Sequence, residues 1–239
     1  FFPSAGLDDD DVLTSFAGLR PLVHQSGASA YETSREHSIF WDERGLLTIC
    51  GGKLTTCRSM AEELLDTYME NGGRERHHHL KRCETDLRPI WGGDGMNQGL
   101  SSIDDMEIWE RFPDLPAFQR KHLWEHYGEH LEGYLESDLA EEGALEVLVE
   151  GEGFCRGEID LAVYYGQARS TADVLKRRST LFYKDPNHGL EVAPFVSERI
   201  AELLGFDADW VEADLATYRA EVALSQRWRN PGLRSVATK

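Results

Sequence analysis

Positive charge is scarce in this sequence. Lys and Arg together number 25 against 43 Asp and Glu, which leaves a formal net charge of −18. A chain this acidic repels the phosphate backbones of DNA and RNA, so we expect no nucleic-acid partner. The same repulsion disfavours electrostatic docking on anionic lipids.

Long hydrophobic runs are missing as well. Charged residues interrupt every apolar stretch well before the roughly 18 residues that a membrane-spanning helix needs, so we expect no such span. No basic start followed by an apolar segment and a small-residue cleavage site is visible, and we expect no secretory signal. The sequence starts Phe1-Phe2-Pro3 without an initiator Met, and we interpret it as a fragment of a longer protein.

Cysteine is rare and shows no Cys-x-x-Cys pair. Irregular spacing in a chain without a visible signal predicts free thiols in a reducing compartment, and hence a cytoplasmic location. We expect these thiols to be small buried side chains rather than ligands. The four cysteines are Cys50, Cys57, Cys83 and Cys155.

The chain does contain enough apolar material for a core, since 41% of its residues are hydrophobic and six are Trp. The residue patterns predict an α+β fold in three parts. Residues 1–72 hold a few strands and one helix, residues 73–104 form a linker rich in turn-forming residues, and residues 105–239 form an all-helical domain.

Apolar runs and turn formers give the expected elements of each part. In the first part, the strands are residues 12–23, 37–41 and 46–50, with a turn at residues 42–45. In the last part, the helices are residues 105–111, 114–138, 140–150, 157–178, 190–204 and 207–226.

The most informative segment is Gly-Gly-Lys-Leu-Thr-Thr, which joins the strand at residues 46–50 to an amphipathic helix. Glycines let a flat ligand approach the backbone, and a helix N-terminus favours negative charge. Lys53 adds a positive charge, and a Thr is expected to cap the helix. Gly-Gly also ends strands for purely steric reasons, so this pattern alone does not prove a site.

Two established nucleotide motifs do not fit the chain. A P-loop needs Gly where Leu47 stands and Ser or Thr where Leu54 stands. No complete Gly-x-Gly-x-x-Gly precedes a helix, so a complete dinucleotide-binding fold is absent. Arg20 and Arg35 flank predicted strands, and an Arg fork matches phosphate or carboxylate oxygens. Either arginine alone would also pass as an ordinary surface residue.

Together these segments carry a family resemblance. Residues 16–22 (Phe-Ala-Gly-Leu-Arg-Pro-Leu), 33–37 (Thr-Ser-Arg-Glu-His) and 46–62 around the Gly-Gly-Lys turn resemble FAD-dependent glycerol-3-phosphate dehydrogenase. The helical half resembles that family's C-terminal helical domain. Cys57 departs from the family, which usually has Tyr there. The family's N-terminal half, with its Gly-rich pyrophosphate loop, has no counterpart from Phe1 onward.

The resemblance implies the oxidation of sn-glycerol 3-phosphate to dihydroxyacetone phosphate by hydride transfer to FAD, performed by the whole enzyme and not by this fragment alone. It implies that Arg20 and Lys53 are catalytic and that Arg20 and Arg35 bind substrate. The general base is expected in the missing half. The implied cofactor-binding residues are Gly51, Gly52, Lys53, Leu54, Thr55 and Thr56.

The resemblance leaves the partners partly open. The electron acceptor is a quinone or oxygen, and peripheral association with the cytoplasmic face of a membrane and a homo-oligomer both stay open. The fold class it implies is a partial FAD-binding domain followed by an all-helical domain.

Two alternatives come from other features. The helical half could be an interaction or cap module without catalysis of its own. A zinc hydrolase is the second alternative, because His122, His126 and His130 recur every four residues and residues 126–130 have the His-x-x-Glu-His spacing of inverted zinc peptidases. The run of three His at residues 77–79, with Cys83, is a weaker metal candidate, and we expect it to be solvated.

Overall fold

The computed structural model describes residues 3–19, 36–90, 92–93 and 107–229. The chain divides into two compact units, of which one is residues 17–91 and the other combines residues 1–16 with residues 92–239. We call them the hairpin unit and the helical unit. None of the described helices is long and apolar enough to cross a membrane.

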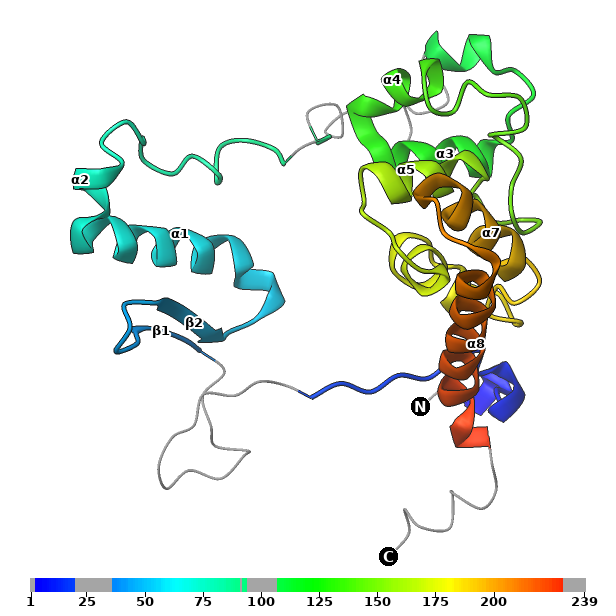
Figure 1. Cartoon of the computed structure of the whole chain (residues 1–239), viewed down its shortest axis with the longest axis horizontal. Coiled ribbons are helices and arrows are strands. Elements are labelled where there is room, and N and C mark those ends of the chain that lie inside the picture. Colours follow the sequence, from blue (N-terminus) through cyan, green and yellow to red (C-terminus); the bar gives the residue numbers. More distant parts are fainter. Residues whose placement is uncertain (1–2, 20–35, 91, 94–106, 230–239) are drawn as a thin grey trace, which may run out of the picture. The chain divides into compact units, whose positions relative to one another are not determined.

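The hairpin unit contains a two-stranded antiparallel sheet followed by a helix (Figure 1). Strands β1 (His37–Trp41) and β2 (Leu47–Gly51) pair in a register that runs from His37 opposite Gly51 to Trp41 opposite Leu47. The predicted turn between them is confirmed. Asp42 Oδ1 accepts hydrogen bonds from the backbone N–H groups of Arg44 at 2.9 Å and Leu46 at 2.8 Å.

Helix α1 (Cys57–Tyr68) follows β2 through a short 3₁₀ turn, Leu54–Thr56. A π-helical turn, Met69–Gly73, connects it to α2 (Arg74–Arg76). Among the described residues of this unit only Gly73 is buried. Its large apolar side chains therefore lie at the surface, among them Phe40, Trp41, Leu46, Leu54 and Leu65.

The helical unit holds the remaining helices. They are α3 (Ala117–Tyr127), α4 (Leu131–Glu136), α5 (Gly157–Tyr164), α6 (Leu181–Lys184), α7 (Ala193–Leu204) and α8 (Ala208–Ser225). Residues Asp173–Arg178 form a π-helical segment. Short 3₁₀ turns lie at Pro3–Ala5, Asp9–Asp11, Glu107–Arg111, Gly128–His130 and Arg227–Arg229. The mostly helical chain with one small sheet confirms the predicted α+β fold class.

Two hydrophobic clusters form the core of the helical unit, and α5 contributes to both. Ile159 and Val163 of α5 pack in a cluster with side chains of α6, α7 and α8, including the buried Tyr218. Leu161 of the same helix packs in the other cluster, with α3, α4 and the buried Trp109. This arrangement explains why residues 157–163 are all buried except the half-buried Asp160.

Four predicted elements are wrong in detail. Residues 12–19 are extended but pair with no strand among the described residues, and residues 20–23 of that predicted strand lie outside them. Residues 140–150 form turns rather than a helix, because Gly143 has a φ of +80° and Val147 bridges to Cys155 as an isolated β-pair. The predicted helix at 157–178 breaks after α5, where Gln167 has a φ of +55°.

The predicted helix at 114–138 is also interrupted, at Gly128. This residue has a φ of +52°, and a Cβ there would overlap the carbonyl oxygen of Gly92. Only glycine satisfies both conditions, so the chain breaks between α3 and α4 at this position.

Two glycine substitutions test this packing. Gly128→Ala should destabilise the helical unit by about 2 kcal/mol or more, because alanine at that φ is strained and its Cβ meets backbone. Gly133→Ala, the matched control, should stabilise it by roughly 0.5–1 kcal/mol, because Gly133 is exposed within α4 with open space around it. Urea unfolding followed by circular dichroism measures both, and equal effects of the two substitutions would contradict the packing described.

Candidate functional site

The Gly-Gly turn of the hairpin unit has the predicted strand–turn–helix form. Gly51 and Gly52 have φ angles of +78° and +83°, a conformation that side chains rarely adopt. A Cβ on Gly52 would lie 2.5 Å from Met60 Sδ and 3.3 Å from His37 Cβ. The positive φ angle therefore favours glycine at position 52, where a Cβ would also press on His37.

The start of α1 differs from the prediction in one respect. Thr56 does not cap the helix through its side chain, and its Oγ1 instead donates to the carbonyl of Lys53 at 3.0 Å. Ser59 Oγ likewise donates to the carbonyl of Thr56 at 3.0 Å. Both hydroxyls donate to backbone carbonyl groups. Neither caps the N–H groups at the start of α1, where the helix dipole is positive.

The whole turn is accessible from outside. Residues 53–59 are all exposed, and the Leu54 side chain reaches 89% of its full exposure. Lys53 has no ion-pair partner among the residues that the structure describes, so its charge is free to meet an anionic group. A half-buried glycine pair, an exposed and uncapped helix start and a free ammonium together suit a planar ligand that carries or gains negative charge.

The charged groups near the turn are already paired with each other. His37 Nε2 lies 2.9 Å from Glu63 Oε2, and Arg58 Nη1 lies 2.7 Å from Glu62 Oε2. The hydrogen bond to Glu62 raises the pKa of Arg58. Of the basic side chains named here, Lys53 is the one left for a ligand.

The structure places only part of the predicted site. Gly51, Gly52 and Lys53 lie in one turn with Leu54, Thr55 and Thr56, as their adjacency in sequence requires. The two predicted substrate-binding residues, Arg20 and Arg35, lie outside the described residues.

A buried carboxylate in the helical unit was not anticipated from the sequence. Glu158 is 1% exposed and accepts hydrogen bonds from Tyr127 Oη at 2.9 Å and from the backbone N–H of Cys155 at 2.7 Å. His122 Nε2 lies 2.9 Å from one of its oxygens and 3.1 Å from the other. The available signal was one Glu inside the apolar run of α5, which needs partners once buried.

This Glu158 cluster is internally satisfied. Burial, followed by the charge of Glu158, raises the pKa of Tyr127 and of the Cys155 thiol well above their usual values. Both groups therefore remain protonated at neutral pH, and the carboxylate joins α3 to α5 rather than facing a ligand.

The zinc alternative does not fit this geometry. Helix α3 ends at Tyr127, so His126 and His130 do not share a continuous helix. His122 is engaged by Glu158, and His126 Nδ1 lies 2.8 Å from the carbonyl oxygen of His122. Within residues 3–19, 36–90, 92–93 and 107–229, no three His, Cys, Asp or Glu side chains are placed to hold a metal ion.

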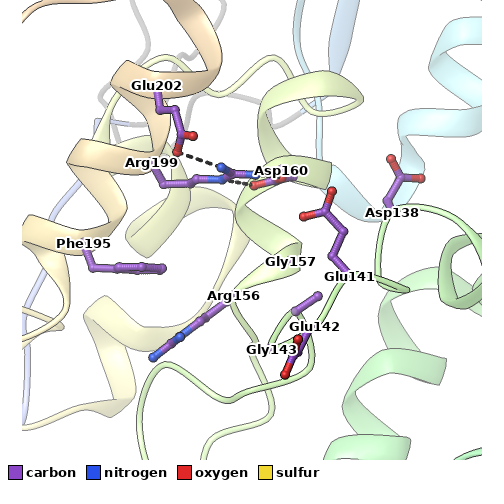
Figure 2. A pocket seen from close by; sticks show the side chains of 11 residues that line it. Asp138, Glu141, Glu142, Gly143, Arg156, Gly157, Asp160, Phe195, Arg199 and Glu202 are labelled. Carbon is purple, nitrogen blue, oxygen red and sulfur yellow. Dashed lines mark hydrogen bonds and ion pairs between the residues drawn. The ribbon is translucent and has the colours of Figure 1, made fainter.

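A pocket of about 240 Å³ opens between α5, α7 and the turns that follow α4 (Figure 2). Arg199 Nε donates to Asp160 Oδ1 at 2.9 Å, and its Nη1 lies 2.7 Å from Glu202 Oε2. Arg156 Cζ lies 5.1 Å from the centre of the Phe195 ring. Five carboxylates and two arginines line the pocket, so it disfavours a phosphate ester.

The expectation of buried cysteines holds only in part. All four thiols are unpaired, and Cys155 is fully buried. Cys57, however, is exposed because it is the first residue of α1 on the open side of the turn, where packing does not reach.

The family model and the similar proteins that match this chain point to related enzymes. Residues 83–211 match the family described as the C-terminal domain of alpha-glycerophosphate oxidase. The aerobic glycerol-3-phosphate dehydrogenase of Staphylococcus haemolyticus is 31% identical over 208 residues, which is 86% of this chain and 37% of that protein. The glycerol-3-phosphate dehydrogenase 2 of Mycobacterium bovis is 27% identical over 212 residues, 89% of this chain and 35% of that protein.

A third relative is eukaryotic. The probable mitochondrial glycerol-3-phosphate dehydrogenase of Dictyostelium discoideum is 30% identical over 212 residues, which is 84% of this chain and 31% of that protein. The chain thus spans about a third of the length of the relatives that it matches.

The exposed thiol of Cys57 and the buried thiol of Cys155 provide a test of the structure. In the native chain at neutral pH, N-ethylmaleimide should modify Cys57 rapidly and leave Cys155 unmodified, because burial and Glu158 keep that thiol protonated and covered. Peptide mass spectrometry measures both sites. In guanidinium chloride all four cysteines should react, and modification of Cys155 as fast as Cys57 in the native chain would contradict the structure.

Proposed function

The chain belongs to the family of the C-terminal domain of alpha-glycerophosphate oxidase, and from that membership we propose that it supplies the C-terminal part of an enzyme that oxidises sn-glycerol 3-phosphate to dihydroxyacetone phosphate. The proposed cofactor is FAD, which when bound accepts a hydride from C2 of the substrate. The observation that carries the proposal is the Gly-Gly turn, followed by exposed residues and the free Lys53, in a chain similar to glycerol-3-phosphate dehydrogenases over more than four-fifths of its length.

The residues of the turn fit a flavin in three ways. Two glycines with positive φ leave the backbone uncovered, no side chain caps the start of α1, and the turn is open to a partner surface. In the proposed complex, residues 51–56 lie at the edge of the flavin ring where negative charge accumulates on reduction. The dipole of α1 stabilises that charge and so favours reduction.

Lys53 and two arginines are the proposed substrate-binding groups. Lys53 lies beside the flavin and the substrate hydroxyl, where its ammonium orients the C2 oxygen. Arg20 binds nearer the reacting carbon and Arg35 nearer the phosphate, which a guanidinium fork matches in shape and charge. These cations are an exception in a chain of net charge −18.

The helical unit takes the role of a cap in this proposal. Its buried carboxylate is satisfied by Tyr127, His122 and Cys155, and the pocket between α5 and α7 is lined mainly by acidic side chains. Neither feature suits an anionic substrate, so we assign the unit no group that acts on the substrate. Four unpaired thiols fit a reducing compartment, and we propose a cytoplasmic location on that basis.

Substitution of Lys53 tests the site. In the full-length enzyme, Lys53→Ala should lower kcat/KM for sn-glycerol 3-phosphate by about 100-fold, because it removes a charge aimed at the reacting oxygen. Lys81→Ala is the matched control, since Lys81 is also an exposed lysine of the hairpin unit, and it should leave kcat/KM unchanged. Steady-state kinetics measures both, and equal values for the two variants would refute the role of Lys53.

Flavin content provides a second test. The purified 239-residue chain should carry far less than one FAD per chain, because it has no Gly-x-Gly-x-x-Gly motif to hold the pyrophosphate. Visible absorbance of the purified chain, before and after dialysis against FAD, measures the occupancy. Stoichiometric flavin in the chain by itself would contradict the proposal that the pyrophosphate site lies elsewhere in the enzyme.

A further inference from the structure

The net charge of the chain is divided very unevenly between its two units. The helical unit has 32 Asp or Glu against 15 Lys or Arg, a net charge of −17, whereas the hairpin unit has 11 against 10, a net charge of −1. Exposed charges are largely screened beyond about 8 Å at physiological ionic strength. A contact between two molecules is therefore governed by the local charges that meet there and not by the total of −18.

The hairpin unit carries a positively charged stretch at residues 74–82, which we call the basic segment. It begins with α2 and contains four Lys or Arg but a single Glu. All four cationic side chains are exposed, and none has an ion-pair partner among the described residues. These four are Arg74, Arg76, Lys81 and Arg82.

Hydrogen bonds and a ring contact hold the basic segment next to α1. The backbone N–H of His77 donates to the carbonyl of Gly73 at 2.8 Å, and the N–H of Leu80 donates to the carbonyl of His77 at 3.0 Å. The ring centroid of His77 lies 6.0 Å from that of Tyr68 in α1. The backbone that carries the arginines is thus already ordered, so binding an anionic partner costs less conformational entropy.

The pocket of the helical unit in Figure 2, which we call the acidic pocket, carries the complementary charge. Two of its five carboxylates are paired with Arg199. The other three lie in the turns that follow α4 and have no ion-pair partner among the described residues. Phe195, which is 39% exposed, adds an aromatic ring on which a guanidinium can stack. The three unpaired carboxylates are Asp138, Glu141 and Glu142.

We propose that the three arginines of the basic segment dock at the acidic pocket of a second copy of this chain. A guanidinium group can pair with a carboxylate through two parallel hydrogen bonds. Charge complementarity identifies the partner, because the chain itself supplies three unpaired arginines for three unpaired carboxylates. Two copies related by a twofold axis make this contact twice, since each copy offers both surfaces.

Sedimentation equilibrium of the purified 239-residue chain tests the association. Exposed ion pairs are individually weak, so we expect a reversible equilibrium between monomers and dimers. Raising NaCl from about 50 mM to about 500 mM should raise the dimer Kd roughly tenfold or more, because salt screens the paired charges. A chain that stays monomeric in low salt would overturn the proposal. A dimer whose Kd does not respond to salt would also overturn it, and would point to the exposed apolar side chains instead.

Reversal of the charges tests which surfaces meet. Arg76→Glu with Arg82→Glu makes the basic segment acidic, and Glu141→Arg with Glu142→Arg makes the pocket basic. Each double variant by itself should stay monomeric, because like charges then face each other. An equimolar mixture of the two should form a mixed dimer, because both contacts again join opposite charges, and this dimer also shows that both variants fold. A mixture that stays monomeric, or a reversed variant that dimerises as tightly as the unmodified chain, would overturn the proposal.

A matched control separates the two surfaces from the total charge. Arg219→Glu with Arg227→Glu changes the net charge by the same amount as reversal of the basic segment. Both arginines are exposed in the helical unit and neither lines the acidic pocket. This control should keep the dimer Kd within about twofold of the unmodified chain, since long-range charge is screened. Loss of the dimer in the control would show that total charge governs association, and would overturn the proposal.

Discussion

Apolar burial is confined to one of the two units, and most other features of the chain follow from this. Every buried hydrophobic side chain among the described residues belongs to the helical unit, where two clusters meet on α5. The hairpin unit leaves Phe40, Trp41 and Leu54 exposed. A two-stranded hairpin and a 12-residue helix are marginal in water without a packed face. In the proposed enzyme, the larger flavin domain would cover these exposed faces.

The same exposure is what makes the Gly-Gly turn a plausible site. The positive φ of Gly52 and the nearby His37 Cβ favour glycine there, so part of the motif serves the backbone and its packing, as a purely steric interpretation expects. The free Lys53 and the missing helix cap are not explained by packing. The net charge of −18 describes the solvated surface, while the proposed substrate-binding groups are all positive.

Local sequence patterns predicted the elements that are determined by residues close together in the chain. They failed where a contact between residues far apart in the chain determines the conformation. The hairpin and α1 follow from two short apolar runs, Asp42 and the glycine pair, all within a few positions of each other. Residues 12–19 have the composition of a strand, yet no described strand pairs with them, and the Val12 carbonyl accepts from the side chain of Arg229. Residues 140–150 have helical periodicity, but Val147 pairs with Cys155 instead. The Glu158 cluster joins α3 to α5 across more than 30 residues, which periodicity does not reveal.

Hydrogen exchange at α1 tests the central claim most directly, because it asks whether the hairpin unit belongs to a larger flavin-binding domain. Backbone amides of Cys57–Tyr68 should exchange orders of magnitude more slowly in the full-length enzyme with FAD than in the 239-residue chain. Amides of α7, Ala193–Leu204, which pack in their own core, should exchange at similar rates in both and serve as the internal reference. Equal exchange at α1 in the two proteins would contradict the account.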